Sequence, residues 1–134
     1  MLIQDWSGLV SKILIIGGNG YIGTRLYNYL DFDVDVIDTC WFGKVIEDTI
    51  VADYKTMSKE FYSEYDTIIL LAGHSSVKMA EGNLNSCFKN NVTNYIQLLE
   101  KLNDKQKFIY ASSSSVYGSV GGRTVNEKYY GFEP

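Results

Sequence analysis

Short apolar runs alternate with longer amphipathic stretches along this chain. The runs are rich in β-branched residues and are bounded by turn residues, which is typical of strands buried in a parallel sheet. They lie at 13–16, 34–37, 49–51, 67–71 and 107–110. Helical patterns lie between them, beginning with YIGTRLYNYL at 21–30. Because parallel neighbours need a crossover that covers one face of the sheet, this alternation predicts a layered α/β fold.

The stretch NSCFKNNVTNYIQLLEKL, residues 85–102, has the clearest helical period. Its apolar residues recur at steps of three and four, which predicts one apolar stripe packed on the sheet. The stripe would contain Phe88, Val92, Tyr95, Ile96, Leu99 and Leu102.

Composition narrows the class of protein. The 134 residues are 46% hydrophobic and 21% charged with a net charge of −4, which fits one globular domain. The basic residues form no cluster that would indicate a nucleic-acid partner, and no apolar run or leader pattern indicates a membrane or secretion. We therefore expect a cytoplasmic protein. Cys40 and Cys87 are too far apart for a metal or redox pair, so reduced thiols and no metal site are expected.

The first apolar run leads directly into a glycine-rich turn, in the sequence ILIIGGNGYIG at 13–23. Read from Gly17 the spacing is G-x-x-G-x-x-G, and read from Gly18 it is G-x-G-x-x-G. Either glycine can form the tight turn, while Gly20 lets main chain meet a pyrophosphate and Gly23 lets the helix lie close to the sheet. Because a strand precedes the motif and a helix follows it, a dinucleotide site is favoured over an ordinary glycine-rich turn.

Asp38 ends the next predicted strand, near the ~20-residue separation that this fingerprint requires. A carboxylate there can accept both ribose hydroxyls of an adenosine and repels a 2′-phosphate, which favours NAD over NADP. Arg25 or Lys44 would weaken this preference if either reached the 2′ position. An aspartate that only caps a turn is the alternative interpretation. No phosphate-binding loop of the G-x-x-x-x-G-K-[ST] type occurs.

Six strings, taken in order, resemble the extended short-chain dehydrogenase/reductase family, in particular its NAD-dependent sugar-nucleotide epimerases and dehydratases. They are GGNGYIG, VIDTCWFG, ADY, LLAGHSSV, NNV and FIYASSSSVYG, and the resemblance runs from Lys12 to about Glu127. It implies a Rossmann-type doubly wound parallel sheet with strand order 3-2-1-4-5, truncated before the sixth strand and the substrate domain. Residues 1–11 would be an N-terminal extension, and 12–134 an NAD-binding domain that is incomplete at its C-terminal end.

The resemblance also implies a set of cofactor contacts. It assigns Gly17, Gly20, Tyr21, Ile22 and Gly23 to the pyrophosphate, Asp38 to the adenosine ribose, Asp53 and Tyr54 to the adenine, Leu71, Ala72 and Gly73 to the strand end beneath the cofactor, Ser75 to the nicotinamide ribose, and Asn91 to a mainly structural tie. For Asp53, a plain helix N-cap remains an alternative. The single histidine, His74, occupies a position that varies in the family.

In this family the active-site hydroxyl matches Ser113, which would hold the C4 oxygen of a sugar nucleotide during hydride transfer to NAD. Ser114 and Ser115 stand where dehydratases carry an acid pair, so 4,6-dehydration is disfavoured. No tyrosine is followed four residues later by the lysine that the family's base requires. We therefore expect the NAD-binding portion of an epimerase-like oxidoreductase, inactive as this fragment.

Two further expectations complete the sequence-based interpretation. A stand-alone dinucleotide-binding sensor or interaction module without catalysis is the alternative to the enzyme. Sheet edges and apolar helix faces left exposed by a truncation favour self-association, so a homo-oligomer is possible.

Overall fold

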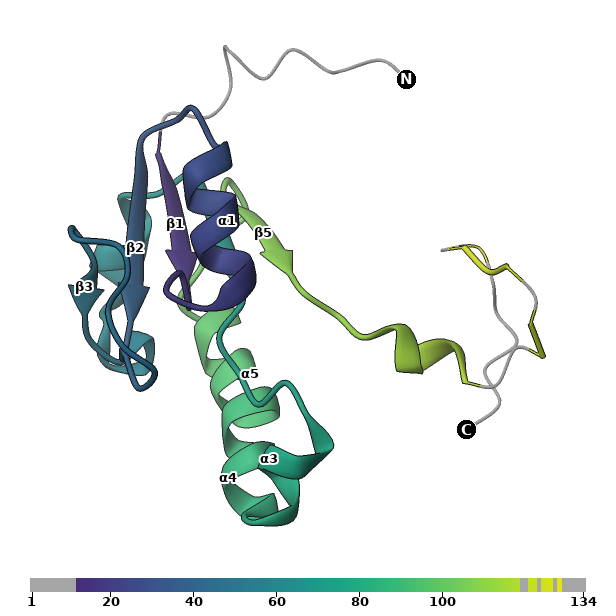
Figure 1. Cartoon of the computed structure of the whole chain (residues 1–134). Helices are drawn as coiled ribbons and strands as arrows, with labels where there is room; N and C mark the ends of the chain where they lie inside the picture. Colours follow the sequence, from purple (N-terminus) through teal and green to yellow (C-terminus); the bar gives the residue numbers. More distant parts are fainter. Residues whose placement is uncertain (1–11, 119–120, 123, 127, 129–134) are drawn as a thin grey trace.

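The computed structural model describes residues 12–118, 121–122, 124–126 and 128. Five parallel strands form one sheet in the order β3-β2-β1-β4-β5 (Figure 1). The strands are β1 (Ile13–Ile16), β2 (Val34–Asp38), β3 (Ile50–Val51), β4 (Thr67–Leu70) and β5 (Lys107–Tyr110). The predicted Rossmann-type fold class and strand order are confirmed, and each strand end lies within one residue of its prediction.

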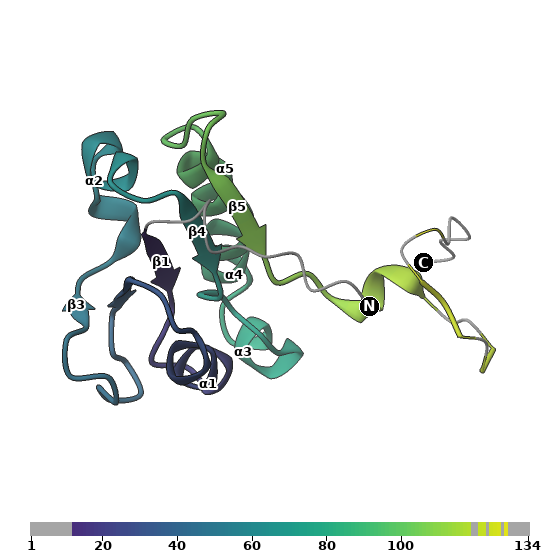
Figure 2. The ribbon, with the colours of Figure 1, turned by 90° about the horizontal axis from the view of Figure 1, so that it is seen from above.

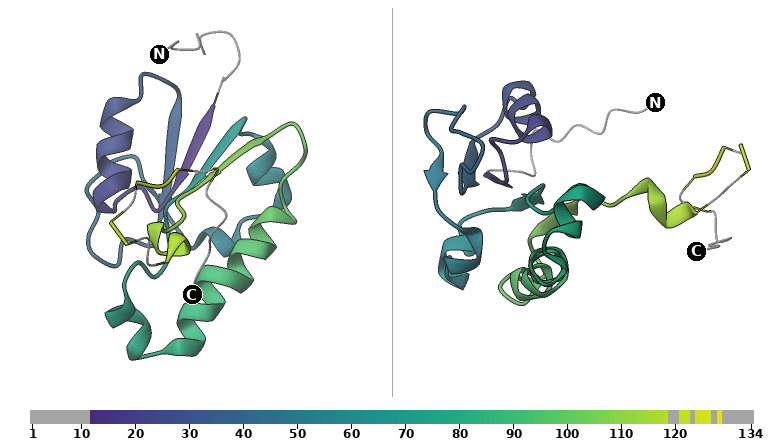
Figure 3. Two further views of the ribbon diagram at one scale, coloured as in Figure 1. Left: turned by 90° about the vertical axis from the view of Figure 1, so that its right-hand side faces the viewer. Right: turned by 60° about the horizontal axis from the view of Figure 1, so that its bottom comes forward.

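Helices cover both faces of this sheet (Figures 2 and 3). Helix α1 (Tyr21–Tyr29) packs on one face, and α2 (Lys59–Ser63) and α5 (Asn94–Leu99) pack on the other. The shorter elements are α3 (Val77–Glu81), α4 (Leu84–Phe88), the 3-10 turns η1 (Tyr54–Thr56) and η3 (Ser114–Tyr117), and the π-helical segment η2 (Lys89–Thr93).

The central strand β1 is buried on both faces, which explains its unbroken aliphatic sequence. Leu14 and Ile16 point into a core layer beneath α2 and α5, where they pack with Tyr62 and Leu98. Ile13 and Ile15 point into the opposite layer beneath α1. The alternation of side chains along one strand thus builds two cores and fixes the strand against both helical layers.

The predicted stripe on residues 85–102 is partly wrong. Phe88 is 63% exposed and Ile96 is 50% exposed, whereas Leu98, which the stripe omits, is only 2% exposed. The π-helical segment η2 between α4 and α5 accounts for the shift at Ile96 and Leu98, because its wider turn changes the phase of the residues after it. The stripe assumed a regular 3.6-residue period through this segment; Tyr95 and Leu102 do pack against the core as predicted, but the buried face is centred on Leu98.

The described helices are short. None of those within the described residues is long and apolar enough to cross a membrane.

Candidate functional site

The turn after β1 packs so tightly that main-chain atoms leave no room for a Cβ at two of its glycines, Gly17 and Gly23. Gly17 has φ +86°, and a Cβ there would lie 2.6 Å from the main-chain N of Ala72. At Gly23 a Cβ would lie 2.6 Å from the carbonyl oxygen of Gly17. The positive φ identifies Gly17 as the residue that makes the tight turn, and Gly23 allows α1 to start directly against it.

Gly20 differs from these glycines because the protein leaves room for a side chain there. A Cβ at Gly20 would make only an ordinary contact, 3.4 Å from the Gly17 carbonyl oxygen. Gly20 is exposed and forms the N-cap of α1 with no side-chain hydrogen bond to the helix. The first helical hydrogen bond runs from Thr24 N–H to Gly20 O, so the preceding N–H groups of α1 have no carbonyl partner within the helix. This helix start is open to an anion.

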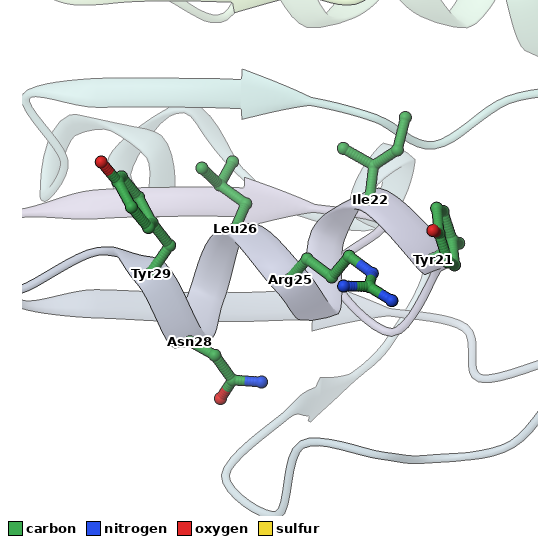
Figure 4. Close-up of a pocket in the computed structure, with 6 residues that line it drawn as sticks. All are labelled: Tyr21, Ile22, Arg25, Leu26, Asn28 and Tyr29. Atoms are coloured by element: carbon green, nitrogen blue, oxygen red, sulfur yellow. The ribbon is translucent and has the colours of Figure 1, made fainter.

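Tyr21 and Ile22 occupy the first turn of α1, and their side chains lie along the outer face of that helix. Together with Arg25, Leu26, Asn28 and Tyr29 they line a shallow open groove (Figure 4). The Arg25 guanidinium lies over the Tyr21 ring, 4.9 Å from its centroid. Tyr21 and Ile22 therefore offer a ligand at the glycine turn their main-chain N–H groups, while their side chains face the groove.

Asp38 ends β2 next to this turn, and its carboxylate is held by two main-chain donors. Asn19 N–H donates to Oδ2 at 3.0 Å, and Cys40 N–H donates to Oδ1 at 2.7 Å. The carboxylate is half-buried, and partial burial together with this nearby charge raises the pKa of the Cys40 thiol. The structure thus places the predicted acid directly beside the glycine turn in a fixed orientation.

Asn19 is a residue of this site that the sequence analysis missed. Its side-chain oxygen accepts the N–H groups of Val45 at 2.6 Å and Ile46 at 2.8 Å, and its amide nitrogen donates to Thr49 Oγ1 at 2.9 Å. These contacts join the glycine turn to the β2–β3 connection. The only signal in the sequence was an amide residue between two glycines, which does not reveal partners 26 to 30 residues away.

The end of β4 lies beside the same turn. Leu71 and Ala72 both donate main-chain N–H groups to Ile16 O, at 2.9 and 3.1 Å, which continues the pairing with β1. Gly73 follows, and a Cβ there would lie 2.8 Å from Asn91 Oδ1. The three predicted residues of this strand end are therefore brought to the carboxyl edge of the sheet, next to Gly17.

Asn91 ties the loop after β4 to the π-helical segment. Its Oδ1 accepts His74 N–H at 2.8 Å and its Nδ2 donates to His74 O at 2.9 Å. The amide therefore binds both main-chain polar groups of one residue. Ser75 follows and is exposed. Among the described residues, its hydroxyl makes a single long contact, 3.8 Å from Met79 Sδ.

Asp53 and Tyr54 lie after β3, at the start of η1. Asp53 caps this turn by accepting Lys55 N–H at 3.2 Å, and its second oxygen pairs with Lys55 Nζ at 2.8 Å. The structure thus shows the capping arrangement that the sequence allowed. Tyr54 packs against the core below α5, where burial and the Asp53 charge raise the pKa of its phenol to about 12.

Ser113 lies in the segment after β5 that projects away from the sheet (Figures 1 and 3). Its hydroxyl accepts Ser115 N–H at 3.2 Å and so caps η3. This partner of Ser113 is local, whereas the residues gathered at the glycine turn lie at the ends of β1, β2 and β4. Within the described residues, no group of three His, Cys, Asp or Glu side chains could hold a metal ion.

The glycine turn, Asp38 and the end of β4 meet at the carboxyl edge of the sheet, where the strand order reverses direction on either side of β1. In open parallel sheets this switch point is where ligands bind. The fold and this site define the class as a Rossmann-like α/β domain.

The chain belongs to the NAD dependent epimerase/dehydratase family, because the model of that family matches residues 13–134. It is 31% identical over 121 residues to a UDP-glucose 4-epimerase of Lactobacillus helveticus, covering 80% of this chain and 37% of the relative. It is 29% identical over 131 residues to Protein CapI of Staphylococcus aureus, covering 81% and 39%. The chain thus spans about two fifths of the length of these curated relatives.

Solved structures agree with this family. The UDP-Glc/GlcNAc 4-epimerase of Campylobacter jejuni is 27% identical with a TM-score of 0.73, over 88% of this chain and 42% of that one. A UDP-glucose 4-epimerase of Thermus thermophilus in complex with NAD is 25% identical with a TM-score of 0.74, over 87% and 42%. The sequence-based recognition of the N-terminal part of this family is therefore confirmed.

Proposed function

We propose that this chain binds NAD at the glycine turn and is the NAD-binding portion of a nucleotide-sugar epimerase-type oxidoreductase. The observation that carries the proposal is the pairing of an unobstructed helix start at Gly20 with a fixed carboxylate at Asp38. The first fits a diphosphate, and the second fits the two hydroxyls of an adenosine ribose. The relative from Thermus thermophilus was solved with NAD, which supports the same ligand here.

In the proposed complex, the diphosphate lies close to the main chain at Gly20, and the main-chain N–H groups of Tyr21, Ile22 and Gly23 bind it. Asp38 accepts the ribose hydroxyls and disfavours a 2′-phosphate, so NAD binds more tightly than NADP. The proposed adenine contacts are Asp53 and Tyr54, and the small residues of the β4 end lie beneath the cofactor. Ser75 is proposed beside the nicotinamide ribose, with Asn91 holding the loop that carries it.

The proposed chemistry of the whole enzyme is hydride transfer between C4 of a nucleotide sugar and the nicotinamide that NAD supplies. Ser113 is the residue of this chain proposed to hold the C4 oxygen by a hydrogen bond. Because η3 projects from the sheet, this role requires the segment after β5 to close toward the carboxyl edge. Relatives that act on UDP-sugars support a substrate of this class.

Calorimetric titration of the chain with NAD and with NADP tests the cofactor proposal. We expect saturable NAD binding that is tighter than NADP binding. Equal affinities would contradict the role of Asp38, and the absence of any NAD binding would contradict the proposed site.

A further inference from the structure

The side chain of Asn19 uses its whole hydrogen-bonding capacity on the β2–β3 connection. Its Oδ1 accepts two neighbouring main-chain N–H groups, those of Val45 and Ile46 at 2.6 and 2.8 Å. Its Nδ2 donates to Thr49 Oγ1 at 2.9 Å and lies 3.7 Å from Cys40 Sγ. Thr49 in turn donates to Ile46 O at 2.7 Å. One side chain in the glycine turn therefore anchors both ends of the segment from residue 40 to residue 49.

This segment includes one of the two donors that hold the Asp38 carboxylate. Cys40 N–H reaches Asp38 Oδ1 at 2.7 Å with Cys40 at φ +55°, the only positive φ of a non-glycine residue among those the structure describes. A left-handed conformation is unfavourable for a residue with a side chain and persists only where its surroundings impose it. The contacts of Asn19 with Val45, Ile46 and Thr49 close the loop that imposes it here.

The same residue supplies the second donor to the carboxylate through its own main chain. Asn19 N–H binds Asp38 Oδ2 at 3.0 Å, so each carboxylate oxygen has one main-chain partner. A carboxylate can accept about four hydrogen bonds, which leaves one further site on each oxygen. Two adjacent hydroxyls of a ribose match those two sites. Fixing the acceptor before the ligand arrives lowers the ordering cost of binding.

We propose, on the basis of the NAD-binding function proposed above, that Asn19 is a positioning residue for cofactor selectivity. It acts through Asp38 and does not itself contact the ribose. By anchoring the β2–β3 connection, it holds the carboxylate where that group accepts two ribose hydroxyls and repels a 2′-phosphate. Without the anchor, the Cys40 turn relaxes and the carboxylate is free to turn away from a 2′-phosphate. Loss of the side chain thus weakens NAD binding and narrows the preference over NADP.

The first test compares Asn19→Ala with Asn28→Ala by titration with NAD and NADP. Asn28 is exposed on α1, and its side chain has no hydrogen-bond partner among the described residues. We expect Asn19→Ala to weaken NAD binding about tenfold, the equivalent of one or two hydrogen bonds, and NADP binding by less. Asn28→Ala should leave both affinities unchanged. A purely structural role would lower the melting temperature without altering the ratio of the two affinities in the folded protein.

Hydrogen exchange of the chain without ligand tests the anchor separately. Asn19→Ala should speed exchange at Val45 and Ile46, whose N–H groups lose their acceptor. Thr49→Val provides a second, nearly isosteric variant that removes one partner and leaves the glycine turn intact. Thr49→Val should also reduce the difference between the NAD and NADP affinities. The variant that combines Asn19→Ala and Thr49→Val should lose less NAD affinity than the sum of the two single losses.

The outcomes separate this inference from the proposed function. If the unmodified chain binds NAD and Asn19→Ala keeps both its affinity and its preference, the positioning role is overturned while the binding site stands. If hydrogen exchange at residues 45–46 were unchanged in Asn19→Ala, the proposed anchoring of the β2–β3 connection by Asn19 would be overturned, while the binding site would stand. If the unmodified chain does not bind NAD, the proposed function and the role of Asn19 both fall.

Discussion

A Cβ atom on Gly17 would lie 2.6 Å from the main-chain N of Ala72, so the turn after β1 rests directly on the segment after β4. This contact joins the two strands between which the strand order changes direction. The glycine is therefore needed for folding as well as for any ligand. Gly20, only three residues further on, has no such constraint. The two positions allow the structural and ligand-related demands on the glycine motif to be separated by experiment.

Gly20→Ala should keep the fold and weaken NAD binding, whereas Gly17→Ala should destabilise the protein. Gly20 has φ −72°, which alanine adopts freely, and an added methyl group meets no backbone closer than 3.4 Å. At Gly17, an alanine would adopt φ +86°, which costs about 1–2 kcal/mol. Its Cβ would also overlap Ala72, which adds a further cost. Thermal melts should show little change for Gly20→Ala and a clear loss for Gly17→Ala, and titration should show weakened NAD binding for Gly20→Ala. Full NAD affinity in Gly20→Ala would contradict close approach of the diphosphate at this position.

The sequence predicted the strands and the position of the glycine turn because each depends on local patterns, whereas the strand order was predicted from the resemblance to a known family. β-branched runs mark strands, and the spacing of glycines marks the turn. The sequence left open whether Gly17 or Gly18 makes the turn, since both lack a side chain. Only the packed structure shows that Gly17 carries the positive φ, while a Cβ on Gly18 would meet Val36 Cγ1 at 2.4 Å.

Asp38→Asn should narrow the preference for NAD over NADP. The amide removes the charge that repels a 2′-phosphate, and it also has only one oxygen to accept from Asn19 and Cys40. Loss of a charged hydrogen bond costs about 1.5–3 kcal/mol, so NAD affinity should fall about tenfold to a hundredfold. NADP affinity should fall less or rise. Titration calorimetry measures both constants.

Asp31→Asn is the matched control for this charge change. Asp31 is exposed just beyond the end of α1 and, like Asp38, loses one negative charge in the variant. A change in cofactor preference confined to Asp38→Asn supports a contact with the ribose. An equal change in both variants would show that net charge, and not the placement of Asp38, sets the preference.

Asn91→Ala should loosen the loop after β4. The variant leaves both main-chain groups of His74 without the partners that now lie 2.8 and 2.9 Å away. Two lost hydrogen bonds predict a loss of about 1–3 kcal/mol in the free energy of unfolding. Asn85→Ala on the exposed side of α4 is the control and should be close to neutral. Urea unfolding measures the difference, and equal stabilities would contradict a structural role for this amide.

Residues that act across the chain were the ones the sequence could not reveal. The apolar pattern does not reveal the π-helical segment at Lys89–Thr93, so the predicted stripe included Ile96, which is exposed, and omitted Leu98, which is buried. Asn19 lies within the glycine motif, but its side-chain partners belong to the β2–β3 connection, which the motif does not indicate. Long-range hydrogen bonds depend on which loops the folded sheet places next to one another, and local sequence does not encode that geometry.

Alkaline pH should destabilise the fold through its buried tyrosines. Burial raises the pKa of Tyr54 from 10.0 to about 12, and it raises the pKa of Tyr62 and Tyr65 as well. The unfolded chain therefore ionises first, so the stability that these phenols contribute is fully present below pH 10 and is lost as the pH rises through the folded-state values. Urea unfolding at increasing pH should show a falling free energy of unfolding above pH 10.

Tyr65→Phe and Tyr29→Phe distinguish this cause from a general effect of charge. The Tyr65 hydroxyl donates to Asp35 Oδ2 at 2.9 Å, an arrangement that a phenolate would oppose, whereas Tyr29 is 86% exposed. Tyr65→Phe should be less stable than the unmodified chain near neutral pH, because Asp35 loses a donor, yet its stability should decline less steeply at alkaline pH. Tyr29→Phe should follow the unmodified curve throughout. If the free energy of unfolding fell equally steeply with pH in the unmodified chain and in both variants, Tyr65 would not contribute to the loss of stability.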